Sequence, residues 1–468
     1  MNNLNNSHFI LILLIITIIL IQISNEIEFN PIPEGNGKLN QEYSHQNENN
    51  LFFIFLNFRH GARASLHLID DYNDMLGGNW EGKGELTNLG RRQHYEVGLK
   101  NRKRYSFFLE NEYNPKEVLI YSTEYNRSMM SVGQQLLGLY NNINYSEHGY
   151  NFSDFQNNDI EEINTIIPPI NLFMINEEKD IRKNRYENIF KNLFDCEYAS
   201  NQIIKNWKEP NDIMKNTVKD FIKEYYKILK KEFKDINRKK IKTVKGLDKF
   251  CDCYLSIYYD ENQKHILDKF TKYGKNLTKI KEICDNYLYN IFLYIRNGGY
   301  ATDNYLITIS PVIKKVINWM DIRIAKNNNI NSDYDEPKLV LFSGHDSSLS
   351  EMQHFLKTGF NIDFEYTEYA STQTFELRKY GNLFYVEIYY NDRLKMNITY
   401  EEFKQRITKI VMSDEKIFSL CYTNKSKDKI IIRLVFAITT LLNVLLFINR
   451  RLKLQSKELA SQKIIQIV

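Results

Sequence analysis

Two short segments carry the side chains of this chain that could do chemistry. The first, LFFIFLNFRHGARAS at residues 51–65, places His60 between Arg59 and Arg63, with Gly61 beside them. Guanidinium groups offer forked N–H donors that suit a phosphate or a carboxylate, and an imidazole can act as a base or a nucleophile. Glycine lets the backbone approach a ligand closely. The segment therefore predicts nucleophilic attack on a group that carries negative charge.

The second segment is SGHDSS, in which His345 and Asp346 are adjacent. Taken alone, such a histidine could be a buried core residue and such an aspartate a helix cap. Together with His60 and its two arginines, they complete a set of acid, base and nucleophile around an anion site.

Strands must position both segments. Residues 51–58 and 338–342 are short, apolar and rich in β-branched or aromatic residues, which predicts buried strands. Residues 117–122 predict a third strand, followed by Arg127 in STEYNRSMMS. Ligand sites in open α/β sheets lie beyond the carboxyl ends of strands, where helix N-termini also favour anions. Arg127 either points back at this site or is a surface arginine, and the pattern leaves both open.

Helical periodicity dominates the middle of the chain, from about residue 140 to residue 332. A long amphipathic helix begins there at Asn211 or Asp212, and further helices are predicted at 280–295 and 312–322. Their apolar stripes are typical of a core. The region therefore predicts a helical lobe that is inserted between the two halves of one α/β domain and covers the site.

Two other segments have simpler interpretations. Residues 374–377 and 383–390 predict a hairpin that closes the sheet. Lys83 lies at phosphate-loop spacing from Gly77, but glycine follows it in place of serine or threonine, and no strand precedes it. A mobile glycine-rich loop that ends at a Thr87 helix cap is the better interpretation.

Two apolar runs predict targeting and anchoring. Residues 9–21 have the length of a signal-peptide core, with an uncleaved anchor as the alternative. Residues 430–448 are long enough to span a bilayer and precede Arg450 and Arg451, which favours a transmembrane helix over a cytosolic core helix. The signal places the body of the protein in a lumen or outside the cell, with the tail in the cytosol. Lysosome and cell surface both stay open.

The predicted divisions of the chain follow from these segments. They are 1–24 (signal peptide), 25–50 (flexible lead-in), 51–139 (first part of the α/β domain), 140–332 (helical lobe), 333–412 (second part of the α/β domain), 413–429 (juxtamembrane stalk), 430–448 (transmembrane helix) and 449–468 (cytosolic tail).

Composition narrows the function further. The 468 residues suffice for two lobes, and 62 Lys and Arg against 58 Asp and Glu argue against nucleic acid as a partner. The chain has five cysteines, so in an oxidising compartment most should be bridged, with one free or intermolecular. Cys251 and Cys253 are too close to bridge each other easily, which leaves Cys196, Cys284 and Cys421 as partners. The spacing does not suit zinc. Glycosylation sequons occur at Asn144, Asn151, Asn276, Asn397 and Asn424.

The three strand ends together resemble those of a known family. RHGxR after the first strand, STxxxR after another and GHD after a third resemble the histidine acid phosphatases, the branch of the histidine phosphatase superfamily that includes lysosomal-type acid phosphatases and phytases. The resemblance covers most of residues 51–400, including GELTNLGRRQH at 84–94 and YASTQTFEL at 369–377. It implies an α/β fold with a mixed open sheet and flanking helices, like that of phosphoglycerate mutase, plus an inserted, mainly helical lobe.

The resemblance also implies a role for each residue of the site. His60 would be the nucleophile and Asp346 the acid that protonates the leaving oxygen, with no metal or cofactor. The groups that hold the phosphate would be Arg59, Arg63, Arg127 and His345. The chain departs from the family at Ser65, where proline is usual and would stiffen the loop, and at Glu124, where aspartate is usual. His67 and His94 would be structural or loop residues, although His94 could also support the pocket from behind.

Elementary electrostatics agrees with these roles. Nearby arginines disfavour the protonated form of His60 and lower its pKa, so it stays nucleophilic in an acidic compartment, where low pH favours protonated Asp346.

The sequence thus predicts a membrane-anchored acid phosphatase that hydrolyses small phosphate monoesters through a phosphohistidine. The alternatives are a phytase or another specialised phosphomonoesterase of the same fold, a transferase of the phosphoglycerate-mutase type, and an inactive surface glycoprotein. A homodimer is a possible assembly.

Overall fold

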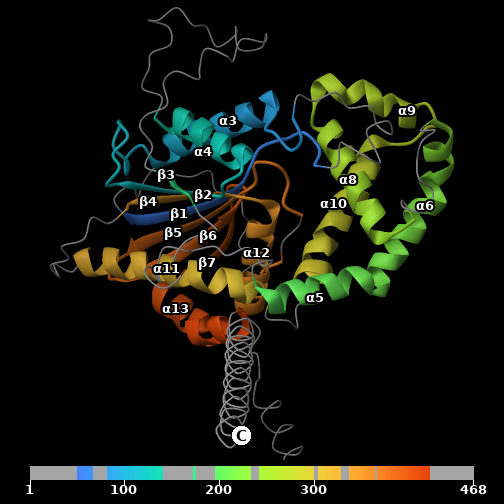
Figure 1. Ribbon diagram of the computed structural model, residues 1–468. Coiled ribbons are helices and arrows are strands. Elements are labelled where there is room, and N and C mark those ends of the chain that lie inside the picture. The colour runs from blue at the N-terminus through green and yellow to red at the C-terminus, as the bar shows by residue number, and fades with distance from the viewer. Residues whose placement is uncertain are drawn as a thin grey trace, which may run out of the picture. The chain divides into compact units, whose positions relative to one another are not determined.

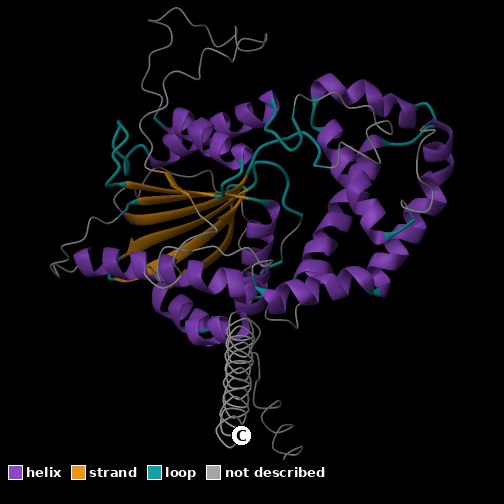
Figure 2. Ribbon diagram, in the orientation of Figure 1, coloured by secondary structure: helices purple, strands orange, loops and turns teal. Residues whose placement is uncertain are grey.

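The fold is organised around a mixed β-sheet, shown as arrows in Figures 1 and 2. The structure is a computed structural model, which describes residues 50–66, 82–140, 172–174, 196–232, 242–299, 304–327, 337–363 and 366–421. Within these ranges the sheet has seven strands in the order β3-β2-β4-β1-β5-β6-β7. The strands are β1 (Leu51–Arg59), β2 (Val118–Ser122), β3 (Leu172–Met174), β4 (Leu339–Gly344), β5 (Thr372–Tyr380), β6 (Leu383–Tyr390) and β7 (Arg393–Thr399).

The strand directions divide the sheet into two halves. β3, β2, β4 and β1 are parallel, whereas β5, β6 and β7 run antiparallel to their neighbours. The central strands β1 and β4 are almost entirely buried and apolar, as expected for parallel strands that are covered on both faces. The sequence analysis located both strands and the hairpin of β5 and β6.

One expectation about the sheet was wrong. The hairpin does not close it, because β7 pairs with β6 and forms a further edge. Asn391 and Asp392 both have positive φ, which is the conformation of a tight two-residue hairpin turn. β7 reads RLKMNIT, in which Leu394, Met396 and Ile398 alternate with polar residues, so it carries a period-two strand signal that the sequence analysis did not use, although the strand is largely exposed.

Helices cover both faces of the sheet (Figure 1). Side chains of β1 alternate between the faces, as the pleat of a strand requires. Ile54, Leu56 and Phe58 pack in a cluster with residues of α3 (Asn88–Tyr105) and α4 (Asn126–Leu139). Phe53 and Phe55 belong to a second cluster. Its helices on this face are α11 (Asn304–Asn327), α12 (Asp346–Phe360) and α13 (Tyr400–Ile410).

The remaining helices form a helical lobe beside the sheet, green to yellow in Figure 1. They are α5 (Glu197–Lys208), α6 (Asp212–Glu232), α8 (Val244–Tyr258), α9 (Asp268–Thr271), α10 (Leu277–Asn290), the 3₁₀ segment Glu261–Leu267 and the π-helical turn Ile291–Arg296. Asn211 caps α6 by accepting a hydrogen bond from the Met214 N–H at 2.9 Å. Thr87 likewise accepts from Gly90 N at the start of α3, as expected.

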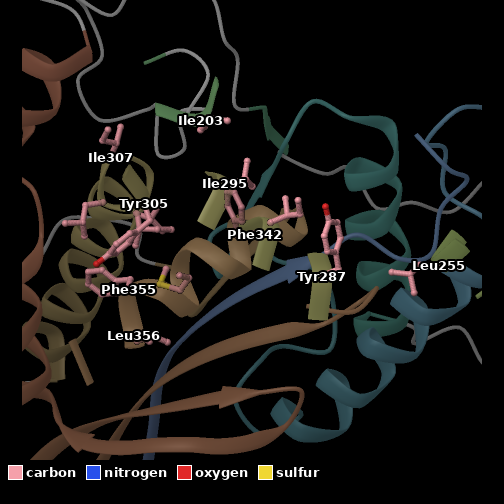
Figure 3. Packing of buried hydrophobic residues seen from close by; sticks show 14 of the residues in the cluster. Ile203, Leu255, Tyr287, Ile295, Tyr305, Ile307, Phe342, Phe355 and Leu356 are labelled. Carbon is pink, nitrogen blue, oxygen red and sulfur yellow. The ribbon is translucent and has the colours of Figure 1, made fainter. Parts of the chain in front are cut away.

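The lobe and the sheet share one hydrophobic core. The second cluster runs from Phe53 under the sheet to residues of α5, α8 and α10, and Figure 3 shows part of it, with Tyr305 and Phe355 near Phe342 and Ile295. Two elements inside the 140–332 segment belong to the sheet layer: β3 pairs with β2, and α11 packs on β1. The predicted domain boundaries remain predictions.

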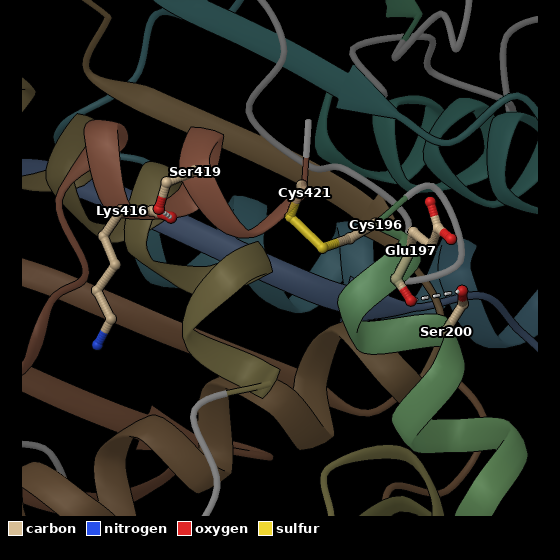
Figure 4. The surroundings of a disulfide bond; sticks show 6 residues. All are labelled: Cys196, Glu197, Ser200, Lys416, Ser419 and Cys421. Carbon is tan, nitrogen blue, oxygen red and sulfur yellow. Dashed lines mark hydrogen bonds between the residues drawn. A yellow bond between two sulfur atoms is a disulfide. The ribbon is translucent and has the colours of Figure 1, made fainter. Parts of the chain in front are cut away.

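Two disulfides tie the lobe together. Cys196, just before α5, is bonded to Cys421, which follows it by 225 residues (Figure 4). Cys251 of α8 is bonded to Cys284 of α10, and Cys253 is free and buried. The sequence left this pairing open.

Several expectations concern residues outside the described ranges. They are the signal peptide at 1–24, nearly all of the lead-in at 25–50, His67, Asn144, Asn151, Asn424, the end of the stalk at 413–429, the transmembrane helix at 430–448 and the tail at 449–468. Among the helices that are described, none is long and apolar enough to cross a membrane.

A close helix crossing yields the first prediction. A Cβ atom on Gly138 of α4 would lie 2.2 Å from the Tyr95 carbonyl oxygen of α3, whereas a Cβ on Gly133 of the same helix would meet nothing within 4 Å. Gly138→Ala should therefore lower the free energy of unfolding by about 1–3 kcal/mol, because the backbones must separate. Gly133→Ala should leave it unchanged or raise it by up to about 1 kcal/mol. Urea unfolding of both variants measures the difference, and equal effects would contradict the packing described.

Candidate active site

The carboxyl ends of three neighbouring parallel strands place the candidate residues together. Arg59 at the end of β1 is in register with Gly344 at the end of β4, and Ser122 of β2 is in register with Ser343 of β4. His60 and His345 are thus the first residues beyond two adjacent strands. Their rings lie 5.4 Å apart, so segments almost 300 positions apart in the chain form one site.

His60 is held as a neutral imidazole with one defined tautomer. Its side chain is buried, and Nδ1 donates a hydrogen bond to the Gly61 carbonyl oxygen at 2.9 Å. Because a carbonyl can only accept, the proton is on Nδ1 and the lone pair is on Nε2. Burial, and then the positive charge of Arg59, holds the pKa of His60 well below its ordinary value. This is the state that a nucleophilic histidine requires.

Three arginines line the pocket around His60. Arg59 donates from Nη1 to the Thr367 carbonyl at 2.6 Å, and its guanidinium carbon lies 4.2 Å from the Tyr369 ring centroid. Arg63 donates to the Ala64 carbonyl at 3.0 Å. Arg127, whose direction the sequence left open, faces the same pocket. The Nε atoms of all three are buried and have no hydrogen-bond partner, so each guanidinium keeps a donor that no protein group satisfies.

Their pKa values reflect this crowding. For Arg59, burial favours the neutral form, but Tyr366 and Asp346 more than compensate and raise the pKa above its ordinary value. For Arg127, burial and the charge of Arg63 lower the pKa to about 10, so this arginine is still protonated at neutral pH.

His345 and Asp346 lie at the start of helix α12, next to His60 and Arg59. His345 is the N-cap residue, and its Nε2 lies 3.0 Å from Thr123 Oγ1. Burial, and then Arg127, lowers the pKa of His345 to about 3. Asp346 forms an ion pair with Arg59 at 2.9 Å. Burial opposes its ionisation, but the charges of Arg59 and its neighbours outweigh burial, so the pKa of Asp346 lies below its ordinary value.

The loop that carries these arginines is supported by the start of α3. A Cβ atom on Gly61 would lie 2.3 Å from the Gly90 carbonyl oxygen, so only glycine fits there. The Ala62 carbonyl accepts hydrogen bonds from both the N–H and the hydroxyl of Thr87. His94 is buried and bonds through Nε2 to the Arg59 carbonyl at 3.0 Å. The GELTNLGRRQH segment therefore holds the loop from behind.

Residues of the lobe and of the 366–369 segment complete the pocket, which has a volume of about 410 Å³. The sequence analysis missed most of them, because they stand in no recognisable motif. Tyr369 alone lies in a segment that had been singled out. The additional polar lining residues include Asp248, Asp252, Arg296, Glu351, Tyr366 and Tyr369. In the described ranges, no group of three or more His, Cys, Asp or Glu could hold a metal ion.

The model of the histidine phosphatase superfamily, branch 2, matches residues 16–391. The chain belongs to this family. The resemblance stated from the sequence is thereby confirmed. Lysosomal acid phosphatase of Xenopus laevis is 38% identical over 93 residues, which is 19% of this chain and 21% of that protein. Human testicular acid phosphatase is 41% identical over 96 residues, covering 20% and 22%. The matched segment thus spans only about a fifth of these curated relatives.

A solved structure supports the fold. The phytase from Citrobacter braakii superposes with a TM-score of 0.53 at 12% identity, over 77% of this chain and 98% of that one. The mixed open sheet with flanking helices that the sequence predicted is the fold of this family. At this identity the likeness concerns the fold alone.

A carboxyl group of the pocket gives the second prediction. Burial, and then the negative charge of Asp252, raises the pKa of Asp248 from 3.8 to about 7. The folded protein therefore keeps a proton that the unfolded chain releases near pH 4, and the stability from this group is complete below pH ~4 and is lost as pH rises through ~7. Asp248→Asn cannot ionise, so it should raise Tm by about 2–4 °C at pH ~8 and by less at pH ~4.

Thermal unfolding at the two pH values measures this effect. Asp212→Asn is the control, because the Asp212 side chain is 91% exposed and should respond little at either pH. An equal change in Tm for Asp248→Asn at both pH values would contradict the assignment.

Proposed function

We propose that this chain is a phosphomonoesterase of the acid phosphatase type that works through a phosphohistidine. One observation carries the proposal: three arginines with buried, unpartnered Nε donors share a pocket with a neutral imidazole whose lone pair is on Nε2. Such donors match the charge on the equatorial oxygens of a phosphoryl group in transfer. Membership of the histidine phosphatase family supports the same chemistry.

The first half of the reaction transfers the phosphoryl group to the protein. Arg59, Arg63, Arg127 and His345 would bind the phosphate oxygens. Nε2 of His60 attacks phosphorus, the N–P bond forms as the ester P–O bond breaks, and Asp346 donates a proton to the departing oxygen. The Nδ1–H bond to the Gly61 carbonyl keeps the ring orientated throughout.

The protonation of Asp346 depends on the substrate. Arg59 holds the pKa of Asp346 low in the ligand-free site. A bound phosphate dianion adds negative charge and shares the guanidinium of Arg59, and both effects raise the pKa of a neighbouring carboxyl group. An acidic medium then completes its protonation. In the second half, water attacks phosphorus, Asp346 accepts its proton, and phosphate and free His60 are released.

The lining of the pocket favours a substrate with one phosphate over the phytase alternative. Beyond the phosphate cluster, the described lining offers Arg296 as a further cation, whereas Asp248, Asp252 and Glu351 are carboxyl groups. Since Arg296 itself pairs with Glu351, this lining offers little positive charge to bind the additional phosphates of an inositol polyphosphate.

Turnover of aryl and alkyl phosphates by the full-length protein in detergent tests the mechanism. His60→Ala should lower kcat by about 10³-fold or more, because no other group can form the N–P bond. Asp346→Asn should lower kcat by about 10²–10⁴-fold for an alkyl phosphate and far less for 4-nitrophenyl phosphate, whose leaving group needs no proton.

A buried histidine outside the pocket provides the control. His354 on α12 is 3% exposed and bonds to the Ser350 carbonyl. His354→Gln should lower Tm and change kcat by less than about threefold, since it removes packing and no reacting group. Persistent turnover by folded His60→Ala would refute the phosphohistidine.

We also propose that the protein is membrane-anchored, with its body in a lysosome-like lumen or outside the cell. The two disulfides fit an oxidising compartment, and residues 430–448 are apolar enough to span a bilayer. Glycosidase treatment should reduce its apparent mass, and alkaline carbonate should leave it in the membrane fraction. Release by carbonate would contradict the anchor.

A further inference from the structure

One carboxylate of the lobe is bonded to the loop that carries Arg63. Asp252 of α8 accepts a hydrogen bond on Oδ1 from Arg63 Nη2 at 2.7 Å. Its Oδ2 accepts two more, from Ser65 Oγ at 2.8 Å and from the Leu66 N–H at 2.8 Å. A single side chain thus engages three positions of the loop from the opposite side of the pocket.

These contacts are largely out of water. The side chains of Arg63 and Asp252 are 5% and 11% exposed, and Ser65 is fully buried. Removal of one partner from a buried ion pair leaves an uncompensated charge, so the pair is sensitive to substitution. Since Nη1 of Arg63 bonds to the Ala64 carbonyl and Nη2 to Asp252, both ends of the guanidinium are fixed. The direction of its unpartnered Nε is then fixed as well.

The position of Asp252 is itself secured on both sides. Cys251 is bonded to Cys284, which fastens α8 to α10, and the Cys253 sulfur lies 3.0 Å from Ser65 Oγ. The carboxylate is therefore held by the lobe, whereas the groups that donate hydrogen bonds to it belong to the loop that follows β1. Ser65, the departure from the family pattern, is part of this contact.

We propose that Asp252 is a positioning residue, which orients Arg63 for phosphate and stiffens the Ser65 to Leu66 segment from the lobe. The inference rests on the proposed function, because it assumes that Arg63 binds phosphate. Asparagine at this position has one oxygen and no charge, so it cannot accept all three hydrogen bonds. Asp252→Asn should weaken the binding of inorganic phosphate about tenfold and raise KM for 4-nitrophenyl phosphate similarly, with a smaller change in kcat.

Two further variants separate positioning from general damage to the lobe. Glu232 of α6 is a carboxylate of the lobe that does not line the pocket; it is 16% exposed, accepts a hydrogen bond from the Tyr273 hydroxyl and pairs with Lys272. Glu232→Gln should lower Tm, yet leave phosphate affinity within about twofold. Ser65→Ala removes one of the three hydrogen bonds and should weaken the binding of phosphate about threefold. The double variant, Ser65→Ala with Asp252→Asn, should bind phosphate no more weakly than Asp252→Asn alone, because both changes act through one contact.

Calorimetric titration of the full-length protein with inorganic phosphate, beside steady-state kinetics, makes the measurement. Unchanged phosphate affinity in Asp252→Asn, or an equal loss of affinity in Glu232→Gln, would overturn the inference and leave the proposed function intact if the unsubstituted protein hydrolyses phosphate esters. Absence of both turnover and phosphate binding in the unsubstituted protein would overturn the proposed function instead. If Asp252→Asn does not fold, Ser65→Ala decides, since unchanged affinity in that variant refutes the positioning role.

Discussion

The structure depends on keeping three arginines and an unprotonated histidine together in a pocket that is largely removed from water. Positive charges at this density repel one another, and burial adds to the cost of each. Carboxylates and aromatic rings, rather than solvent, stabilise these charges. Asp346 is paired with Arg59, Asp252 with Arg63, and Tyr369 stacks on Arg59. Burial, and then the positive field that is balanced in this way, keeps His60 neutral, so the balance has to be partial.

Strands were predictable from the sequence because burial on both faces leaves a continuous apolar run. This property located β1 and β4, and with them His60, His345 and Asp346, whose positions at strand ends follow from the chain direction alone. The direction of the Arg127 side chain was harder to predict, because one turn of helix separates this residue from its strand and its direction depends on how α4 packs. The edge strand β7 was missed because it is short and largely exposed and has no continuous apolar run, although its apolar and polar residues alternate.

The counter-charges could not be predicted in the same way. Asp252 lies almost 190 positions from Arg63, in a lobe whose helices show only a core-facing stripe, and a carboxylate beside two cysteines signals nothing by itself. Its partner depends on where the lobe rests on the sheet, which no local pattern encodes. The disulfide pairing was open for the same reason. In this fold, the candidate reacting groups lie near strand ends, where the sequence pattern shows them, whereas the groups that contact them are determined by tertiary packing.

The bond between Cys196 and Cys421 closes a covalent ring in the chain. Asp252, His345 and Asp346 are inside this ring, whereas His60 and Arg127 precede it. A protease that cuts the backbone once anywhere between the two cysteines therefore opens the ring without releasing a fragment. The nicked molecule keeps every residue of the pocket in one covalent body. On a non-reducing gel it would migrate as a single species, and it would separate into two fragments only after reduction.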